Sequence, residues 1–270
     1  MINSFFMMQD VKKQLLWRVE RYMSNSTAAE TLAHTLFTSR TYWESEAGKS
    51  LWDSQRACLG PLVDSRSGGH SLEMGMGPAL MSMSGIAHRL QWAPTRASAP
   101  SDQTLVCPPD RLALPDSCLD VVVLHHWLEH LQDAHHALQE AARVTSDSGL
   151  LVLFGFNPLG VSGVVKQWRK RHGQYPWNGQ WRTASRMGDW LAFVDFEVER
   201  VDYCCFRSWP GGRCVEHWES LGRRYNCPLG ESYMVLAKRR QRHAPKQRIK
   251  FGLKAPVAAS SLGATRTNSR

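Results

Sequence analysis

Two continuous apolar runs constrain the fold of this chain more than any other feature. Residues 120–124 read DVVVL, and residues 150–156 read LLVLFGF. A strand with one solvent-facing side alternates apolar and polar residues, whereas an unbroken apolar run is typical of a strand buried on both faces. A helical pattern over 133–144 lies between the two runs, as in a βαβ unit. The sequence therefore predicts a mostly parallel sheet covered by helices on both faces.

The remaining elements follow the same alternation. Shorter strands are expected over 71–74, 89–92 and 104–107, and two late strands over 196–203 and 232–238. Such a late pair is typical of the antiparallel edge of a mixed sheet. From apolar spacing and capping signals, helices are expected over 9–24, from Thr27 onward, and over 46–63, 133–144, 161–171 and 184–194.

Positive charge is concentrated at the C-terminal end. The formal net charge is +9, but ten Lys and Arg and no acid lie within 238–270, so the other 237 residues sum to −1. This end has almost no apolar periodicity and is expected to be disordered. It is a candidate for weak contact with nucleic acid or an acidic surface. We expect an N-terminal helical segment (1–44), an α/β domain (45–238) and a basic tail (239–270).

Hydropathy and cysteine usage indicate the compartment. No apolar run approaches the roughly 18–20 residues of a membrane span, and the N-terminus lacks the features of a signal peptide. The seven cysteines include no CxxC pair. They predict reduced thiols rather than a metal site or a disulfide framework. We therefore expect a cytoplasmic protein without a membrane span.

The first candidate site follows the first expected strand. Glu73 ends this strand, and Gly75 and Gly77 form a Gly-x-Gly loop after it. Glycine lets the chain turn sharply and brings the backbone close to a ligand, because no Cβ blocks the approach. The acid can accept hydrogen bonds from a ligand amine or from loop amides. An ordinary tight turn between strand and helix is the alternative interpretation.

Two more candidate segments follow later strands. Asp110, in a loop after the third strand, can accept from an exocyclic adenine amine, although a turn residue in a Pro-rich loop is the alternative. The run DVVVL delivers His125, His126 and Glu129 to the carboxyl end of a buried strand. That edge is where open α/β sheets bind ligands.

In this order and spacing, the three segments resemble the class I S-adenosylmethionine-dependent methyltransferases, in particular the branch that includes the ubiquinone- and menaquinone-biosynthesis enzymes. Residues 73–79 resemble the ExGxGxG motif of that family, and residues 110–115 resemble its GDxxxLP motif. Residues 120–144 resemble its DVVxxxxxLEHxxD segment and the helix that follows. The resemblance covers roughly 45–238. It implies a Rossmann-like, seven-stranded mixed sheet flanked by helices, with S-adenosylmethionine across its carboxyl edge.

The resemblance also implies a role for each site residue. It assigns the amino-acid end of the cofactor to Glu73, Gly75 and Gly77. It assigns the adenine to Asp110, Arg111 and Leu112, and it places His125 and His126 near the transferred methyl group. His126 and Glu129 are the candidate general bases, needed only if the acceptor must lose a proton. The acceptor is expected to be a small or apolar molecule, covered in one interpretation by tryptophans from the second half of the chain.

Three departures from the family pattern bear on function. Ala79 stands where a third glycine is expected, and Pro109 stands where a glycine precedes Asp110. The end of the second strand, residues 91–96, has no acid for the ribose hydroxyls. A degenerate, non-catalytic binding module of the same fold is therefore an alternative.

A second alternative is a zinc hydrolase. Residues 126–130 read HWLEH, which matches the H-x-x-E-H signature of some zinc proteases. Its position directly after a buried strand favours the methyltransferase interpretation, in which no metal is expected.

Overall fold

Seven strands form one mixed sheet in the order β3-β2-β1-β4-β5-β7-β6. Their bounds are β1 His70–Gly75, β2 His88–Ala93, β3 Thr104–Val106, β4 Leu119–His125, β5 Thr145–Phe156, β6 Phe196–Cys204 and β7 Ser232–Arg239. β1 to β5 pair in parallel, and β7 runs antiparallel between β5 and β6. The predicted fold class, a Rossmann-like seven-stranded mixed sheet, is confirmed.

The computed structural model describes residues 27–64, 69–81, 85–99, 101, 103–169, 175–207, 212 and 214–240. The helix expected over 9–24 and nearly all of the basic tail lie outside these residues. Residues 27–44 are helical, as expected for a helix that includes Thr27. The other helices are α2 Glu46–Asp64, α3 Ala134–Val144, α4 Val161–Arg169, α5 Ala184–Phe193 and α6 Glu216–Arg224.

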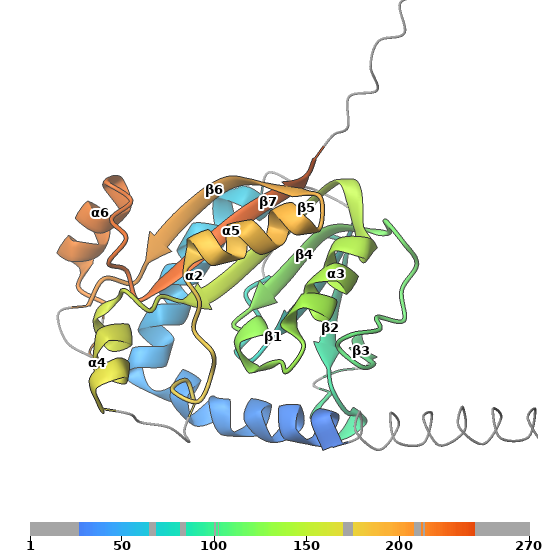
Figure 1. Ribbon diagram of the computed structural model, residues 1–270, viewed down its shortest axis with the longest axis horizontal. Helices are drawn as coiled ribbons and strands as arrows, with labels where there is room; N and C mark the ends of the chain where they lie inside the picture. The colour runs from blue at the N-terminus through green and yellow to red at the C-terminus, as the bar shows by residue number, and fades with distance from the viewer. Residues whose placement is uncertain are drawn as a thin grey trace, which may run out of the picture. The chain divides into compact units, whose positions relative to one another are not determined.

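The unbroken apolar runs are buried on both faces of the sheet, as predicted. In β4, Val122 and Leu124 pack in one core cluster together with the apolar faces of α3 and α5. Val121 and Val123 point to the opposite face and pack with the apolar face of α2. Figure 1 shows the resulting three layers, with α3 and α5 in front of the sheet and α2 behind it. All four of these β4 side chains are at most 1% exposed.

Two elements differ from the prediction. β5 begins at Thr145, directly after α3, rather than at Leu150. The pairing with β4 shifts register between Leu119 and Val121, which absorbs the extra residues as an irregularity. Residues 145–149, which precede the expected strand, are therefore part of it. α6 was not predicted, because its sequence, EHWESLGRR, is mostly polar and gives no apolar stripe long enough to stand out.

The expectation that all cysteines are reduced was wrong. Cys205 and Cys214 form a disulfide, while five other cysteines among the described residues are free. A turn at Cys205, whose φ is 59°, brings the two Cα atoms to 5.2 Å, within the range that a disulfide requires. A CxxC pattern gives no sign of this pair, because the two cysteines are nine positions apart.

The parallel strands bring their carboxyl ends to one edge. Gly75 at the end of β1 pairs with His125 at the end of β4, which in turn pairs with Phe154 of β5. The helix over 27–44 reaches the same edge, because its Trp43 indole donates to the carbonyl of Met76. This edge holds the candidate site.

Candidate functional site

The loop after β1 is held by the Glu73 carboxylate. One carboxylate oxygen accepts from the amide of Leu80 at 2.7 Å, and the other accepts from the amide of Met81 at 3.1 Å. Glu73 is only 8% exposed. Burial raises the pKa of this carboxyl to about 7, and the two amide donors oppose that rise. The acid therefore fixes the shape of the Gly-x-Gly loop.

The two glycines of this loop are required by close packing. A Cβ at Gly75 would lie 2.9 Å from the Cβ of His125. A Cβ at Gly77 would lie 2.7 Å both from Cε1 of His125 and from Cε2 of Trp43. Between them, the Met76 carbonyl accepts from Trp43 Nε1 at 2.8 Å and from Ser39 Oγ at 2.5 Å. The loop is thus sandwiched between β4 and the helix over 27–44.

A cavity of about 670 Å³ lies beside this loop. Its volume is within the range of small-molecule sites. The loop residues 75–79 and Glu73 form one wall, and the end of β2 forms another through Gln91 and Trp92. Ser98 also lines the cavity, and the N-terminal helices supply the other lining side chains, which are Leu36, Ser39, Arg40, Trp43, Glu44, Lys49 and Trp52.

A buried polar network lies behind the loop, centred on Gln55 of α2. His125 and His126, at the end of β4, are both fully buried. The Gln55 carbonyl oxygen lies 2.9 Å from His125 Nε2, and its amide nitrogen lies 2.7 Å from His126 Nε2. The same amide donates to Ser232 Oγ at 2.7 Å. One glutamine side chain therefore contacts both histidines and β7.

The network fixes both histidine tautomers. Since a carbonyl oxygen only accepts, His125 must carry its proton on Nε2. Since the Gln55 amide only donates, His126 must accept at Nε2 and carry its proton on Nδ1. That proton is directed to Glu129, whose Oε2 lies 3.3 Å away. The other Glu129 oxygen accepts from the Phe156 amide at 2.6 Å.

Both imidazoles are neutral at physiological pH. Burial lowers the pKa of His126 to about 3. Burial also lowers the pKa of His125 well below its usual value, and His126 nearby adds to the effect. His126 has φ of 50°, an uncommon conformation for a residue with a Cβ. The chain turns sharply there, which is how the strand delivers both rings to the same network.

The second predicted segment lies apart from the cavity wall. Leu112 is buried in the core, Asp110 is half-buried and Arg111 is exposed, and none of them lines the cavity. Glu140 accepts from the Leu112 amide at 3.0 Å, and Arg143 donates to the Leu112 carbonyl at 3.1 Å. The segment is nevertheless adjacent, because the Trp92 indole, which lines the cavity, donates to the Cys107 carbonyl at 3.0 Å.

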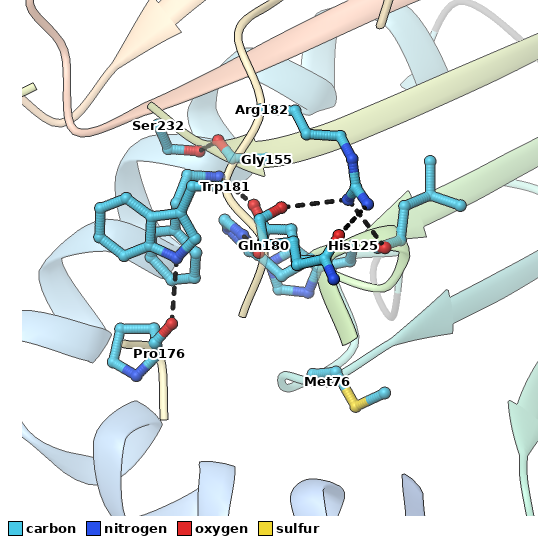
Figure 2. A network of polar contacts seen from close by, with 12 residues as sticks. Met76, His125, Gly155, Pro176, Gln180, Trp181, Arg182 and Ser232 are labelled. Atoms are coloured by element: carbon cyan, nitrogen blue, oxygen red, sulfur yellow. Dashed lines mark hydrogen bonds and ion pairs between the residues drawn. The ribbon is translucent and has the colours of Figure 1, made fainter. Parts of the chain in front are cut away.

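Aromatic side chains cover the end of β5. The Phe156 ring lies 3.9 Å from the His126 ring, and Trp181 stacks on Phe156 at 5.0 Å. Trp177 stacks in turn on Trp181 at 5.4 Å. The covering segment is anchored by hydrogen bonds from Trp181 to the Pro176 carbonyl and from Arg182 to the Leu128 carbonyl (Figure 2). This arrangement places an aromatic surface beside the histidine network.

Sequence reasoning missed the residues that the N-terminal helices contribute. Gln55 carried a detectable signal, since it lies four residues after Leu51 and four before Leu59, on the buried face of α2. A polar residue on an apolar helix face indicates a buried hydrogen-bond partner. Trp43 and Ser39 gave no comparable signal, because their partner is a backbone carbonyl.

Nothing in the described part of the chain favours a metal centre. No group of three or more His, Cys, Asp and Glu side chains within it is placed to hold a metal ion. His126, the first histidine of the HWLEH sequence, already has both ring nitrogens engaged by Gln55 and Glu129.

Comparison with known proteins identifies the domain type. Residues 75–153 match the methyltransferase domain family. An S-adenosylmethionine-dependent methyltransferase from Thermotoga maritima superimposes with a TM-score of 0.60 at 15% identity, covering 78% of this chain and 99% of that one. The fold is therefore that of class I S-adenosylmethionine-dependent methyltransferases, and the domain match indicates S-adenosylmethionine as the cofactor.

Two further relatives are informative. A chain from the complex between the Trm112 methyltransferase activator and a methyltransferase of Haloferax volcanii gives a TM-score of 0.54 at 17% identity, covering 77% of this chain and 96% of that chain. The uncharacterised protein YafS of Escherichia coli K12 is 31% identical over 159 residues, which is 58% of this chain and 64% of YafS. The chain thus spans less than two thirds of that relative. The assignment to the quinone-biosynthesis branch stays a prediction.

Replacing Gln55 tests the tautomer assignment. In the wild type, we expect nitrogen–proton correlation spectra to show the Nε2–H form of His125 and the Nδ1–H form of His126. Gln55→Leu removes the Nε2 partners of both rings and should destabilise the fold by about 1–3 kcal/mol for each polar group left unpaired. Gln55→Glu should raise the pKa of His126, because a carboxylate replaces the amide donor. The control is Gln139→Leu on the exposed face of α3. Finding both rings in one tautomer would contradict the assignment.

The raised pKa of Glu73 predicts a pH dependence of stability. The ordinary pKa of this carboxyl is 4.5, and its pKa in the folded protein is about 7. Between these two pH values, the folded state binds more protons at Glu73 than the unfolded state does. The contribution of Glu73 to stability is therefore greatest below pH 4.5 and is lost as the pH rises to about 7. The loss amounts to roughly 3 kcal/mol.

The measurement for Glu73 is urea unfolding of the wild type and of Glu73→Gln between pH 5 and 8. Every other titrating group is common to both proteins, so their difference isolates Glu73. We expect the stability of the wild type relative to the variant to fall with rising pH. A difference that stays constant over this range would show that burial does not perturb Glu73.

Proposed function

We propose that this protein transfers a methyl group from S-adenosylmethionine to a small apolar acceptor at the carboxyl edge of its sheet. The observation that carries the proposal is the cavity of about 670 Å³ walled by Glu73 and the Gly-x-Gly loop. The family match over residues 75–153 begins in this loop and includes Asp110 and His125. When bound, the cofactor supplies an electrophilic methyl group on a sulfonium.

The loop and its acid fit the amino-acid end of this cofactor. Gly75 and Gly77 expose backbone at the cavity wall, and Glu73 holds the loop in shape through two amides. The Trp52 indole nitrogen also belongs to a residue that lines the cavity, and it is buried without a hydrogen-bond partner in the described structure. An unpaired donor beside a cavity is a position where a polar ligand atom gains a hydrogen bond.

Glu44 is our candidate for the missing ribose acid. The expected position at the end of β2 is taken by Ala93 and Pro94, which are buried and carry no carboxylate. Two carboxylates are found among the described lining residues, and Glu73 is occupied by backbone amides. Glu44, at the end of the helix over 27–44, lines the same cavity and is exposed to solvent. A carboxylate there can accept hydrogen bonds from both ribose hydroxyls.

In this proposal His125, His126 and Glu129 position the acceptor side of the site. In-line methyl transfer mainly requires alignment of donor and acceptor and exclusion of water. The two rings are neutral and fixed, and Glu129 binds both His126 and the Phe156 amide. To act as a general base, His126 would have to lose the hydrogen bond that Gln55 donates to its Nε2. That nitrogen could then take a proton from the molecule that is methylated. The stacked rings of Phe156, Trp181 and Trp177 support an apolar acceptor.

The expected cytoplasmic location is kept in the proposal on hydropathy alone, and the disulfide is the feature that opposes it. No helix among the described residues is both long and apolar enough to cross a membrane. The Cys205–Cys214 disulfide argues against a reducing compartment, since disulfides are rare in the cytosol. Free-thiol counting on protein purified under non-reducing conditions distinguishes a reducing compartment from an oxidising one.

Titration calorimetry with S-adenosylhomocysteine tests the cofactor site. We expect affinity on the order of micromolar for the wild type. Glu44→Gln should weaken it about tenfold or more, because a charge-assisted contact to the diol contributes roughly 1.5–3 kcal/mol. Glu46→Gln is the matched control, since Glu46 is also exposed and begins the next helix without lining the cavity. Equal affinity for both variants would remove Glu44 from the site. No binding by the wild type would favour the non-catalytic module.

A second titration tests the adenine assignment of Asp110. The wild type should bind S-adenosylhomocysteine more tightly than its inosine analogue, which lacks the exocyclic amine. Asp110→Ala should abolish this preference by losing roughly tenfold for the adenine form alone, since about 1.4 kcal/mol corresponds to tenfold. Asp189→Ala, an exposed position on α5, is the control. A preference that survives in Asp110→Ala would place the adenine elsewhere.

A further inference from the structure

Exposed apolar side chains gather on one side of the molecule. Nine large hydrophobic residues among those described are well exposed. Six of them lie in two segments, residues 159–164 and residues 218–229. We call these six the α4–α6 patch; they are Leu159, Val164, Trp218, Leu221, Tyr225 and Leu229. Scattered single residues of this kind are normal, whereas a cluster indicates a binding surface.

The two halves of the patch are joined by hydrogen bonds. The Asn157 side chain, just before α4, donates to the carbonyls of Pro228 and Gly230 at 2.9 and 2.8 Å. A Cβ at Gly160 would lie only 2.8 Å from the Gly230 carbonyl oxygen. The Cys227 amide in turn donates to the Gly222 carbonyl of α6. Figure 1 shows α4 and α6 on the same side of the body.

The α6 part of the patch is a continuous stripe. Trp218, Leu221 and Tyr225 are spaced by three and four residues and therefore lie on one helix face. They are 57%, 36% and 74% exposed. The inner face of α6 packs closely against Phe206, because a Cβ at Gly222 would lie 2.5 Å from the Phe206 ring. The stripe is thus left without a partner within the described protein.

Arginine residues end the α6 part of the patch. α6 ends with Arg223 and Arg224, and the Arg224 guanidinium lies 6.0 Å from the ring centre of Tyr225. The sequence of α4, VSGVVKQWR, contains two basic residues and no acid. Of the α6 acids, Glu219 is turned inward, because its carboxylate accepts from the amides of Cys205 and Phe206.

We propose that the α4–α6 patch docks this protein onto an anionic lipid surface. Exposed Trp and Tyr beside Arg are the combination that membrane–water interfaces favour. Reversible attachment of this kind requires two signals, an apolar insertion and a polybasic segment. The same chain supplies the second signal, with six Lys and Arg and no acid between Arg240 and Lys254. A neutral protein partner would draw no benefit from this charge. The proposal is independent of the methyl-transfer function.

Vesicle co-sedimentation with the full-length protein tests the proposal. We expect binding to vesicles of phosphatidylcholine mixed with phosphatidylglycerol, and much weaker binding to phosphatidylcholine alone. Added salt should weaken the binding, because exposed charges are screened. Trp218→Glu combined with Tyr225→Glu should reduce binding about tenfold or more, since it removes inserted aromatic surface and adds negative charge. Circular dichroism checks that the variant is folded.

The matched control is Phe193→Glu, which changes an exposed aromatic residue outside the patch (77% exposed). We expect it to bind vesicles like the wild type. Three results would overturn the proposal. The first is no sedimentation of the wild type with anionic vesicles, and the second is equal binding by the patch variant. The third is a wild-type dimer that the patch variant dissociates in the absence of vesicle binding, which would make the patch an interface between two copies.

Discussion

The site depends on a single amide, that of Gln55. The primary amide of Gln55 offers an acceptor and a donor at once, so one side chain can accept from an Nε2–H group and donate to an Nε2 lone pair. Its oxygen serves His125, and its nitrogen serves His126 and Ser232. Through these contacts α2 is tied to β4 and β7, and through Glu129 the network reaches the Phe156 amide at the end of β5. The ends of three strands are thereby held in one polar cluster.

The fold was largely predictable because burial on two faces leaves a plain signal. The runs DVVVL and LLVLFGF have no alternation, and their residues do divide between two core clusters. The elements that sequence reasoning missed lack such a pattern. α6 uses its apolar residues on an exposed stripe, and the early start of β5 depends on a register shift against β4. Neither a surface stripe nor a pairing irregularity is visible in the periodicity of one segment.

The site was predictable where the ends of the parallel strands carry it. Glu73, Gly75 and His125 were expected at the same edge, because neighbouring parallel strands end together, and the register pairs Gly75 with His125. The cavity wall opposite them comes from residues 36–52, whose contribution depends on how the N-terminal helices pack. Trp43 bonds to a backbone carbonyl, which has no sequence signature. The Cys205–Cys214 disulfide was missed for a similar reason, since its geometry depends on a turn.

These observations divide the cavity into a sheet half and a helix half. The sheet half contains the loop that resembles the family motif. It departs from that motif at Ala79, which replaces the third glycine, and at the end of β2, where no acid occurs. The helix half contains Glu44, which faces the same space. Burying His125, His126, Gln55 and Glu129 is not explained by stability, because apolar packing of similar volume costs less desolvation. The cost is understandable if the cluster holds the strand ends, and with them the loop and the aromatic cover, in one fixed arrangement around a reacting ligand.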